Sequence, residues 1–259
     1  MTASLKSHSV GATMVLTISN PEHRNALGPE LYAAGIEALN VAESSADVRS
    51  VVIAGEGRHF CAGGNLQRLL GNRQQPPEVQ AQSVGSLHNW IETIHTFPKP
   101  VIAAVEGACA GAGFSLALAC DFIVAARDAV FVMAYSNVGI SPDGGGSWAL
   151  ARSLPRATVM QLLMAGERIT PERLQQLGVV NTLTDNGAAM GEALALAENL
   201  NARAPNALAS IKELVNDAGT NPLHAHLAAE LGHFVRNVHH TNGGEGISAF
   251  LEKRTPQYR

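Results

Sequence analysis

The chain has 259 residues, of which 46% are hydrophobic and 15% are charged, and its formal net charge is −4. This composition predicts a folded globular protein with a large core in one domain, or one domain with a small appendage, and excludes a disordered chain. The slightly acidic balance gives no general attraction to nucleic acid, so an anionic ligand needs a local basic patch.

The cysteines and the apolar segments indicate the cellular compartment of the protein. Cys61, Cys109 and Cys120 form no C-x-x-C pair, and an odd number of cysteines without a signal peptide predicts reduced thiols. The longest apolar run, residues 107–120, is too short and too rich in glycine to span a bilayer. We therefore expect a cytoplasmic protein with neither a membrane nor a nucleic acid as partner.

The hydrophobic pattern changes once along the chain. Short β-branched runs alternate with helical stretches up to about Ala126, which predicts an α/β core. Predicted strands are 13–18, 50–55, 101–105 and 122–126, and predicted helices include 28–43, 86–97 and 110–121. After about Pro155 the chain is predicted to be helical to its end, with helix starts near Thr170, Ala204 and Asn221. We predict a core over residues 1–200 and a helical C-terminal subdomain over 201–259.

Two glycine-rich loops follow predicted strands and lead into helices. The first is GEGRHFCAGGNL (55–66) and the second is EGACAGAGFSLAL (106–118). Each presents unpaired main-chain amides at a helix N-terminus, so two converging loops would form an oxyanion hole. Alternatively, the glycines only permit tight packing of strand against helix. Neither loop matches a phosphate-binding or dinucleotide-binding fingerprint.

Six segments in order resemble the crotonase, or enoyl-CoA hydratase/isomerase, superfamily. They are NPEHRNAL (20–27), FCAGGNL (60–66), KPVIAAVEGACAGAGFSLALACD (99–121), GISPDGGGSW (139–148), AGERITPERLQQLGVVN (165–181) and EGISAFLEKRTPQ (245–257). The resemblance implies an α/β spiral of ββα repeats with C-terminal helices that form a homotrimer or a dimer of trimers. It also implies an acyl-coenzyme A thioester as substrate, with no metal and no cofactor beyond the coenzyme A of the substrate.

The resemblance assigns two amides to the thioester oxygen and several residues to coenzyme A. The amides are those of Gly64 and Ala112; many relatives have glycine at the second position, and alanine can serve there if its φ is negative. The candidate coenzyme A contacts are Arg24, Ala26, Ala62, Phe250 and Lys253, the last two often reaching a neighbouring subunit. An exposed lysine near a chain end is more often simply solvated.

The acid and base of this chain differ from those of a typical hydratase. Where the resemblance places the two hydratase glutamates, the chain has Ser115 and Tyr135. Asp143 is the only acid in the following loop, and it matches the aspartate of the ring-epoxide and enoyl-CoA isomerases of phenylacetate catabolism and of an aryl-CoA dehalogenase. His88 matches the dehalogenase base, although a helix histidine is more often a surface residue. Asp143 could instead be a turn residue or a helix N-cap.

These residues predict an Asp143-mediated proton shift in an unsaturated or ring-derived acyl-CoA, with the enolate stabilised by the oxyanion hole. Three alternatives stay open at this point. His88 and Asp143 could hydrate or hydrolyse an enoyl- or oxepin-type thioester, or Asp143 could displace an aryl halide as a nucleophile. In a different class, the chain could be a non-catalytic acyl-CoA-binding scaffold.

Overall fold

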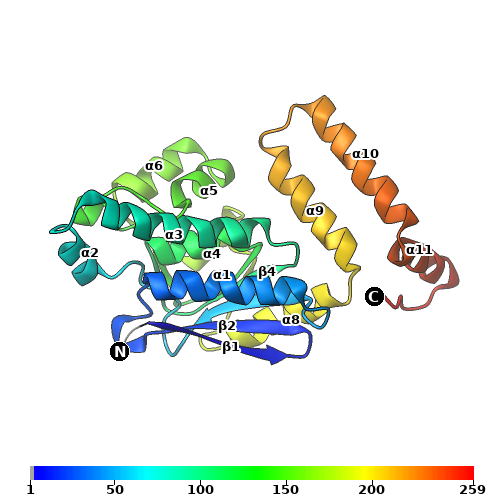
Figure 1. Ribbon diagram of the computed structural model, residues 1–259, viewed down its shortest axis with the longest axis horizontal. Coiled ribbons are helices and arrows are strands. Elements are labelled where there is room, and N and C mark those ends of the chain that lie inside the picture. The colour runs from blue at the N-terminus through cyan, green and yellow to red at the C-terminus, as the bar shows by residue number, and fades with distance from the viewer. Residues whose placement is uncertain (1–2) are drawn as a thin grey trace.

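The computed structural model describes residues 3–259 and shows a six-stranded sheet with helices on both faces (Figure 1). The strand order is β1-β2-β3-β4-β6-β9, with β1 antiparallel to β2 and all other neighbours parallel. These strands are β1 (Ser4–Val10), β2 (Thr13–Ser19), β3 (Ser50–Gly55), β4 (Val101–Val105), β6 (Phe122–Ala126) and β9 (Thr182–Thr184). All of β4 and all of β3 but its last residue are buried, as expected for parallel strands covered on both sides.

A second, three-stranded sheet carries the chain toward the candidate site. It consists of β5 (Ala108–Ala110), β7 (Val130–Val132) and β8 (Arg168–Ile169), in the order β5-β7-β8. Strand β5 leads directly into helix α4 (Ala112–Ala119), whose residues are almost all buried. The second glycine-rich loop is therefore fixed by a strand on one side and by a core helix on the other.

Helices cover the large sheet in two groups. Helix α8 packs on one face, while α1, α3 and α4 form the main core on the other face. The α-helices before the C-terminal arm, in addition to α4, are α1 (Pro29–Ser44), α2 (Leu66–Asn72), α3 (Pro77–Thr96), α5 (Gly146–Ser153), α6 (Arg156–Met164), α7 (Pro171–Gln176) and α8 (Ala189–Asn201). Short 3-10 turns are η1 (Pro21–His23) and η2 (Ser136–Val138).

The last three helices form an arm beside the core (Figure 1). They are α9 (Pro205–Ala218), α10 (Leu223–His239) and α11 (Thr241–Glu252). The Lys212 ammonium on α9 contacts the Asp121 carboxylate at 2.9 Å, and the Asn216 side chain donates to the His95 carbonyl at 2.8 Å. These contacts join the arm to α3 and to the turn before β6, while the division of the chain at residue 200 stays a prediction.

The structure differs from the predicted elements in two places. The chain is not wholly helical after Pro155, because β8 and β9 are strands and β9 completes the large sheet. Strand β1 is not predicted by the pattern, since its residues are mostly exposed and polar.

Candidate active site

The two glycine-rich loops lie side by side. The Cys61 N–H donates to the Ala108 carbonyl and the Ala110 N–H donates to the Cys61 carbonyl, both at 2.9 Å. A Cβ added to Gly63 would come within 3.4 Å of the amide nitrogen of Ala112. The sequence thus places Gly64, the next residue, at the N-terminus of α4, as an oxyanion hole requires.

Both predicted donors are available to a ligand. Within residues 3–259, neither the Gly64 N–H nor the Ala112 N–H donates a hydrogen bond to another protein group. Ala112 is the first residue of α4, where the main-chain N–H has no partner inside the helix and the helix dipole favours negative charge. Non-glycine residues with positive φ are Arg24, Asn25 and Lys253 among those described, so Ala112 meets the condition of a negative φ.

Buried side chains hold the first loop in place. The Gly63 N–H donates to the Cys61 sulfur at 3.4 Å, and burial raises the pKa of the Cys61 thiol to about 12, so the sulfur stays uncharged. Asn25 is fully buried; its side-chain amide donates to the His59 carbonyl at 2.6 Å, and its oxygen accepts from the Asn20 N–H at 2.9 Å. The only signal of Asn25 in the sequence is its place inside the NPEHRNAL motif.

Asp143 and Tyr135 are brought together. The Tyr135 hydroxyl donates to Asp143 Oδ1 at 2.6 Å, and the Ser115 hydroxyl donates to the Asp143 carbonyl at 2.9 Å. Burial, together with the Asp143 charge and this hydrogen bond, raises the pKa of Tyr135 far above its usual range, so Tyr135 is a phenol that donates. A Cβ at Gly111 would lie 3.8 Å from the Tyr135 oxygen, which places this pair beside the second oxyanion loop.

The Asp143 carboxylate does not cap a helix. The residue at the N-cap of α5 is Gly145, with φ of 75°, and it makes no side-chain cap. Asp143 does belong to a turn, because its carbonyl accepts from the Gly146 N–H at 3.4 Å, but this contact uses the main chain. The half-buried carboxylate therefore has Tyr135 as its hydrogen-bond donor, and the N-cap alternative is wrong.

A second buried tyrosine, Tyr32 on α1, lies close enough to Asp143 to respond to its charge. Burial is the main cause that raises the pKa of Tyr32, and the Asp143 carboxylate is the next. The Tyr32 ring is 6.2 Å from the ring of Trp90 between centroids. Tyr32 is a neighbour of the site that the sequence motifs did not identify.

His88 lies on α3 with an exposed side chain. It lines the same cavity as Ser115, Gly144 and Gly145, which are next to the Asp143 loop. Among the contacts of the described residues, no hydrogen bond joins His88 to Asp143. The structure brings His88 to the edge of the site, and its catalytic role stays a prediction.

The candidate coenzyme A residues near the first loop differ in accessibility. Arg24 is exposed, and its backbone lies in the left-handed region with φ of 50°. The Arg24 carbonyl accepts a hydrogen bond from the N–H of the half-buried Ala62 at 2.9 Å. Ala26 is buried; its N–H donates to the His23 carbonyl at 3.1 Å, and its carbonyl accepts from the Asn20 side-chain amide at 3.2 Å. Two further basic residues missed by the motifs, Arg58 and His59, are neighbours of Arg24; burial, then Arg24, then Arg58 lower the pKa of His59.

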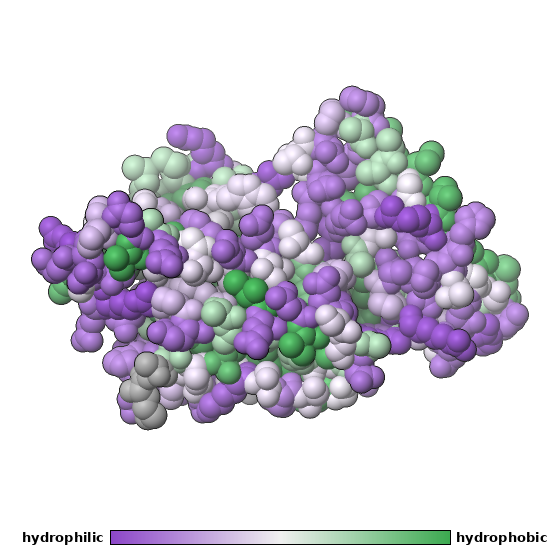
Figure 2. All heavy atoms as spheres, in the orientation of Figure 1, coloured by the Kyte–Doolittle hydropathy of each residue, from purple (hydrophilic) through white to green (hydrophobic). Residues whose placement is uncertain are grey.

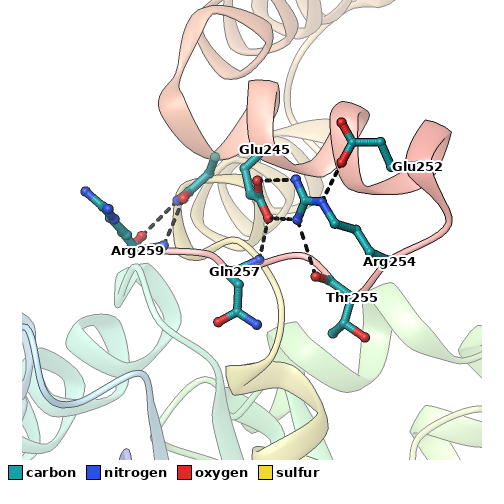
Figure 3. Close-up of polar contacts among 7 residues, drawn as sticks. Glu245, Glu252, Arg254, Thr255, Gln257 and Arg259 are labelled. Carbon is teal, nitrogen blue, oxygen red and sulfur yellow. Dashed lines mark hydrogen bonds and ion pairs between the residues drawn. The ribbon is translucent and has the colours of Figure 1, made fainter.

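The C-terminal candidates lie on a fastened segment. Phe250 is 84% exposed and Lys253 is left-handed with φ of 58°. Figure 3 shows the Arg254 guanidinium between Glu245 and Glu252, with its shortest contacts to each carboxylate at 2.7 Å. The hydrogen bonds from Arg254 are the main cause that lowers the pKa of Glu245 to about 2. The last seven residues thus fold back on α11, and Phe250 and Lys253 face away from the core of their own chain.

Neither a metal site nor a membrane helix is found in the part of the chain that the structure describes. No group of three or more His, Cys, Asp or Glu side chains in residues 3–259 is placed to hold a metal ion. No helix in this range is long and apolar enough to cross a membrane.

Comparison with known proteins identifies the family. The family described as Enoyl-CoA hydratase/isomerase matches residues 9–259. The chain belongs to this family. It is 36% identical over 253 residues to the 1,2-epoxyphenylacetyl-CoA isomerase of Escherichia coli K12, covering 97% of both chains. It is 33% identical over 246 residues to the 2,3-dehydroadipyl-CoA hydratase of the same organism, covering 95% of this chain and 94% of the relative.

Solved structures agree with this assignment. A crystal structure of an enoyl-CoA hydratase from Polaromonas sp. JS666 is 70% identical and superposes with a TM-score of 0.98, covering 98% of this chain and 99% of the other. The protein is thus a crotonase-fold enzyme of the hydratase/isomerase family that acts on an acyl-CoA. Relatives of both reaction types are similar to it, so family membership leaves the choice between isomerase and hydratase to the site.

Proposed function

We propose that the protein is an enoyl-CoA isomerase that moves a proton, and with it a double bond, along an unsaturated acyl-CoA. The observation that carries this proposal is the 2.6 Å hydrogen bond between Tyr135 and Asp143 beside the oxyanion loops. Family resemblance places the hydratase glutamates at Ser115 and Tyr135, so this chain has a single carboxylate where a hydratase would have two. One carboxylate suffices to take up a proton and return it at another carbon.

The mechanism begins with the thioester oxygen bound by the Gly64 and Ala112 N–H groups. These donors stabilise the negative charge that develops when the α-carbon loses a proton, and one such donor is typically worth about 3 kcal/mol. Asp143 takes the proton from C2 of a 3-enoyl thioester, and the C–H electrons form a dienolate. The same carboxyl group then returns the proton to C4, which leaves a 2-enoyl thioester with no gain or loss of atoms.

Tyr135 and Ser115 support the Asp143 loop in this proposal. Tyr135 cannot act as a base near neutral pH because its pKa is raised, so its role is to orient the carboxylate by donating to Oδ1. Oδ2 is then the oxygen free to exchange the proton. The Ser115 hydroxyl fixes the Asp143 main chain, which limits the carboxylate to a small region.

The test compares Asp143→Asn with wild type. Asparagine keeps an oxygen that can accept from Tyr135, so we expect the fold to be retained while isomerisation of 3-hexenoyl-CoA falls by about 100-fold or more. Exchange of the substrate α-proton in heavy water should fall in parallel. The matched control is Asp47→Asn, which changes an exposed aspartate and should leave both rates unchanged.

Hydration of crotonyl-CoA is the reaction that could refute the isomerase proposal. We expect little water addition by either protein, because the base and acid of a hydratase are absent. Robust hydration that survives Asp143→Asn would refute the isomerase proposal and would direct attention to His88 as the group that activates water.

We also propose that copies of the chain associate through the C-terminal arm. Leu223, Leu227, Leu231, Phe234 and Val238 form an exposed apolar stripe along α10, and each is at least 39% exposed. Figure 2 shows hydrophobic groups along the outer edge of this arm. Light scattering after size exclusion should give a trimer or a dimer of trimers; a monomer at micromolar concentration would contradict this proposal.

A further inference from the structure

A cavity of about 760 Å³ opens behind the Asp143 loop. Its near wall includes Ser115, Gly144 and Gly145, and its other walls come from α3, α4, α5 and α9. Figure 2 shows the surface hollowed between the core and the C-terminal arm, where α5 and α9 face each other. Ser115, a lining residue of the cavity, donates its hydroxyl to the Asp143 main-chain carbonyl, so the cavity begins next to the loop that carries Asp143.

The walls beyond Ser115 are mainly aliphatic. Ile91 on α3 and Leu118 on α4 form one side, while Ile211 and Val215 on α9 form the opposite side. Ile211 is 57% exposed and Val215 is 68% exposed, so more than half of each residue is accessible to a ligand. An apolar ligand would bury them, and each fully buried side chain of this size is worth about 1.5–3 kcal/mol.

An aromatic wall completes the cavity. Trp148 on α5 lines it with 51% of its surface exposed. The His95 ring meets the indole edge to face, with centroids 5.3 Å apart and an interplanar angle of 86°, and the Arg152 guanidinium lies 4.6 Å from the indole centroid. The indole is thus held between two partners, which makes it a preformed surface and not a mobile side chain.

Several charged or titratable groups that line the cavity are engaged by neighbours in the chain. Lys212 is paired with Asp121 at 2.9 Å and also donates to the Ile94 carbonyl at 3.0 Å. Arg152 is stacked on Trp148, and burial followed by the Lys212 charge lowers the pKa of His95, so that its ring is neutral. Glu92 and His88 also line the cavity with exposed side chains, and the rest of the surface that remains for a ligand is apolar and aromatic, which favours a hydrocarbon group there.

We propose that this cavity takes the far end of the acyl group, that the substrate carries an extended apolar chain or a ring beyond C4, and that Trp148 determines this preference. The proposal rests on the proposed function because it places the reacting carbons at Asp143. It goes further in naming the class of substrate: a four-carbon acyl group would end near Ser115 and would leave the aliphatic and aromatic walls uncovered.

The test measures binding of saturated thioesters, which cannot react. Isothermal titration should show decanoyl-CoA and 4-phenylbutyryl-CoA binding at least about tenfold more tightly than butyryl-CoA to the wild-type protein. Trp148→Ala should reduce this preference by about five- to tenfold through weaker binding of the two large thioesters alone. Met164→Ala, an exposed residue on α6, is the matched control and should change neither affinity.

A second variant narrows the cavity from the opposite wall. Ile211→Trp should weaken decanoyl-CoA binding by about tenfold and leave butyryl-CoA binding within about twofold of wild type. Equal affinities for short and large thioesters in the wild type, or equal losses for both in Trp148→Ala, would overturn the proposal. Since no proton transfer is involved, these outcomes are independent of the Asp143→Asn test of the isomerase proposal.

Discussion

The Ala112 N–H can be removed without removing helix α4. Ala112 occupies the first helical position, where proline is tolerated because the main-chain N–H has no partner inside the helix. Gly111 precedes it with φ of 50° and ψ of −124°, the mirror image of the extended conformation that a residue before proline favours, and one that glycine adopts freely. Ala112→Pro therefore deletes one oxyanion donor and places a ring carbon where that N–H stood.

The expected loss of rate in Ala112→Pro follows from the number of proposed oxyanion donors. Removal of one of the two oxyanion donors costs about 2.7–4 kcal/mol of transition-state stabilisation, or about 100- to 1,000-fold in rate. The free energy of unfolding should change by less than about 1 kcal/mol, which is about 2–4 °C in Tm for a chain of this size. Thermal unfolding and turnover of 3-hexenoyl-CoA measure the two effects separately.

Ala112→Gly is the matched control, because it keeps the N–H and changes only the methyl group. Its rate should stay within about threefold of wild type. Free coenzyme A has no thioester carbonyl, so its affinity should be nearly the same for both variants and the wild type. A folded Ala112→Pro protein that keeps its rate to within about tenfold would refute the assignment of this amide to the oxyanion.

Three further predictions follow from contacts near the site. Gly113→Ala would place a Cβ 2.7 Å from Cys61 Sγ, and the resulting overpacking should lower the free energy of unfolding by about 1–3 kcal/mol in denaturant titrations. The lowered pKa of His59 means that protonation favours the unfolded chain, so its contribution to stability is present above pH 6.5 and is lost as pH falls through the folded-state pKa. Titrations at several pH values should show this loss in the wild type and less of it in His59→Gln. Lys212→Met leaves the Asp121 carboxylate without its cation, which should cost about 3–5 kcal/mol, and Asp121→Asn in the same chain should recover part of the loss.

Much of the core was predictable because its signals are local. The four predicted strands correspond to β2, β3, β4 and β6, and Pro29 marks the start of α1. Strand β9 was missed because it has only three residues and acquires its identity by pairing with β6. Strand β1 was missed for a different reason: it is an exposed edge strand, held by its antiparallel pairing with β2 and not by a hydrophobic face.

The candidate site was also predictable only in part. Gly64, Ala112 and Asp143 lie in motifs that the sequence displays, so their candidacy needed no coordinates. The hydrogen-bond partner of Asp143 was not predictable in this way. The sequence shows only that Tyr135 replaces a carboxylate, and its hydrogen bond to Asp143 depends on how the loop folds. Residues that meet across long separations, such as His95 and Trp148 at the cavity wall, give no signal in the sequence at all.

One half of the candidate site consists of main-chain groups and the other half of side chains. This difference affects which substitutions can change the reaction. The proposed oxyanion donors are main-chain groups held by β5, by the buried Cys61 and by the start of α4, so side-chain substitutions reach them only through the core. The Asp143 carboxylate, Tyr135 and Trp148 all come from one segment, residues 135–148. We therefore expect substitutions in this segment to alter the proposed base or the size of the acyl group while the proposed oxyanion donors stay in place. Family resemblance places one of the two hydratase glutamates inside this segment, at Tyr135, and the other on α4, at Ser115, so we expect a change of reaction type to require substitutions in both places.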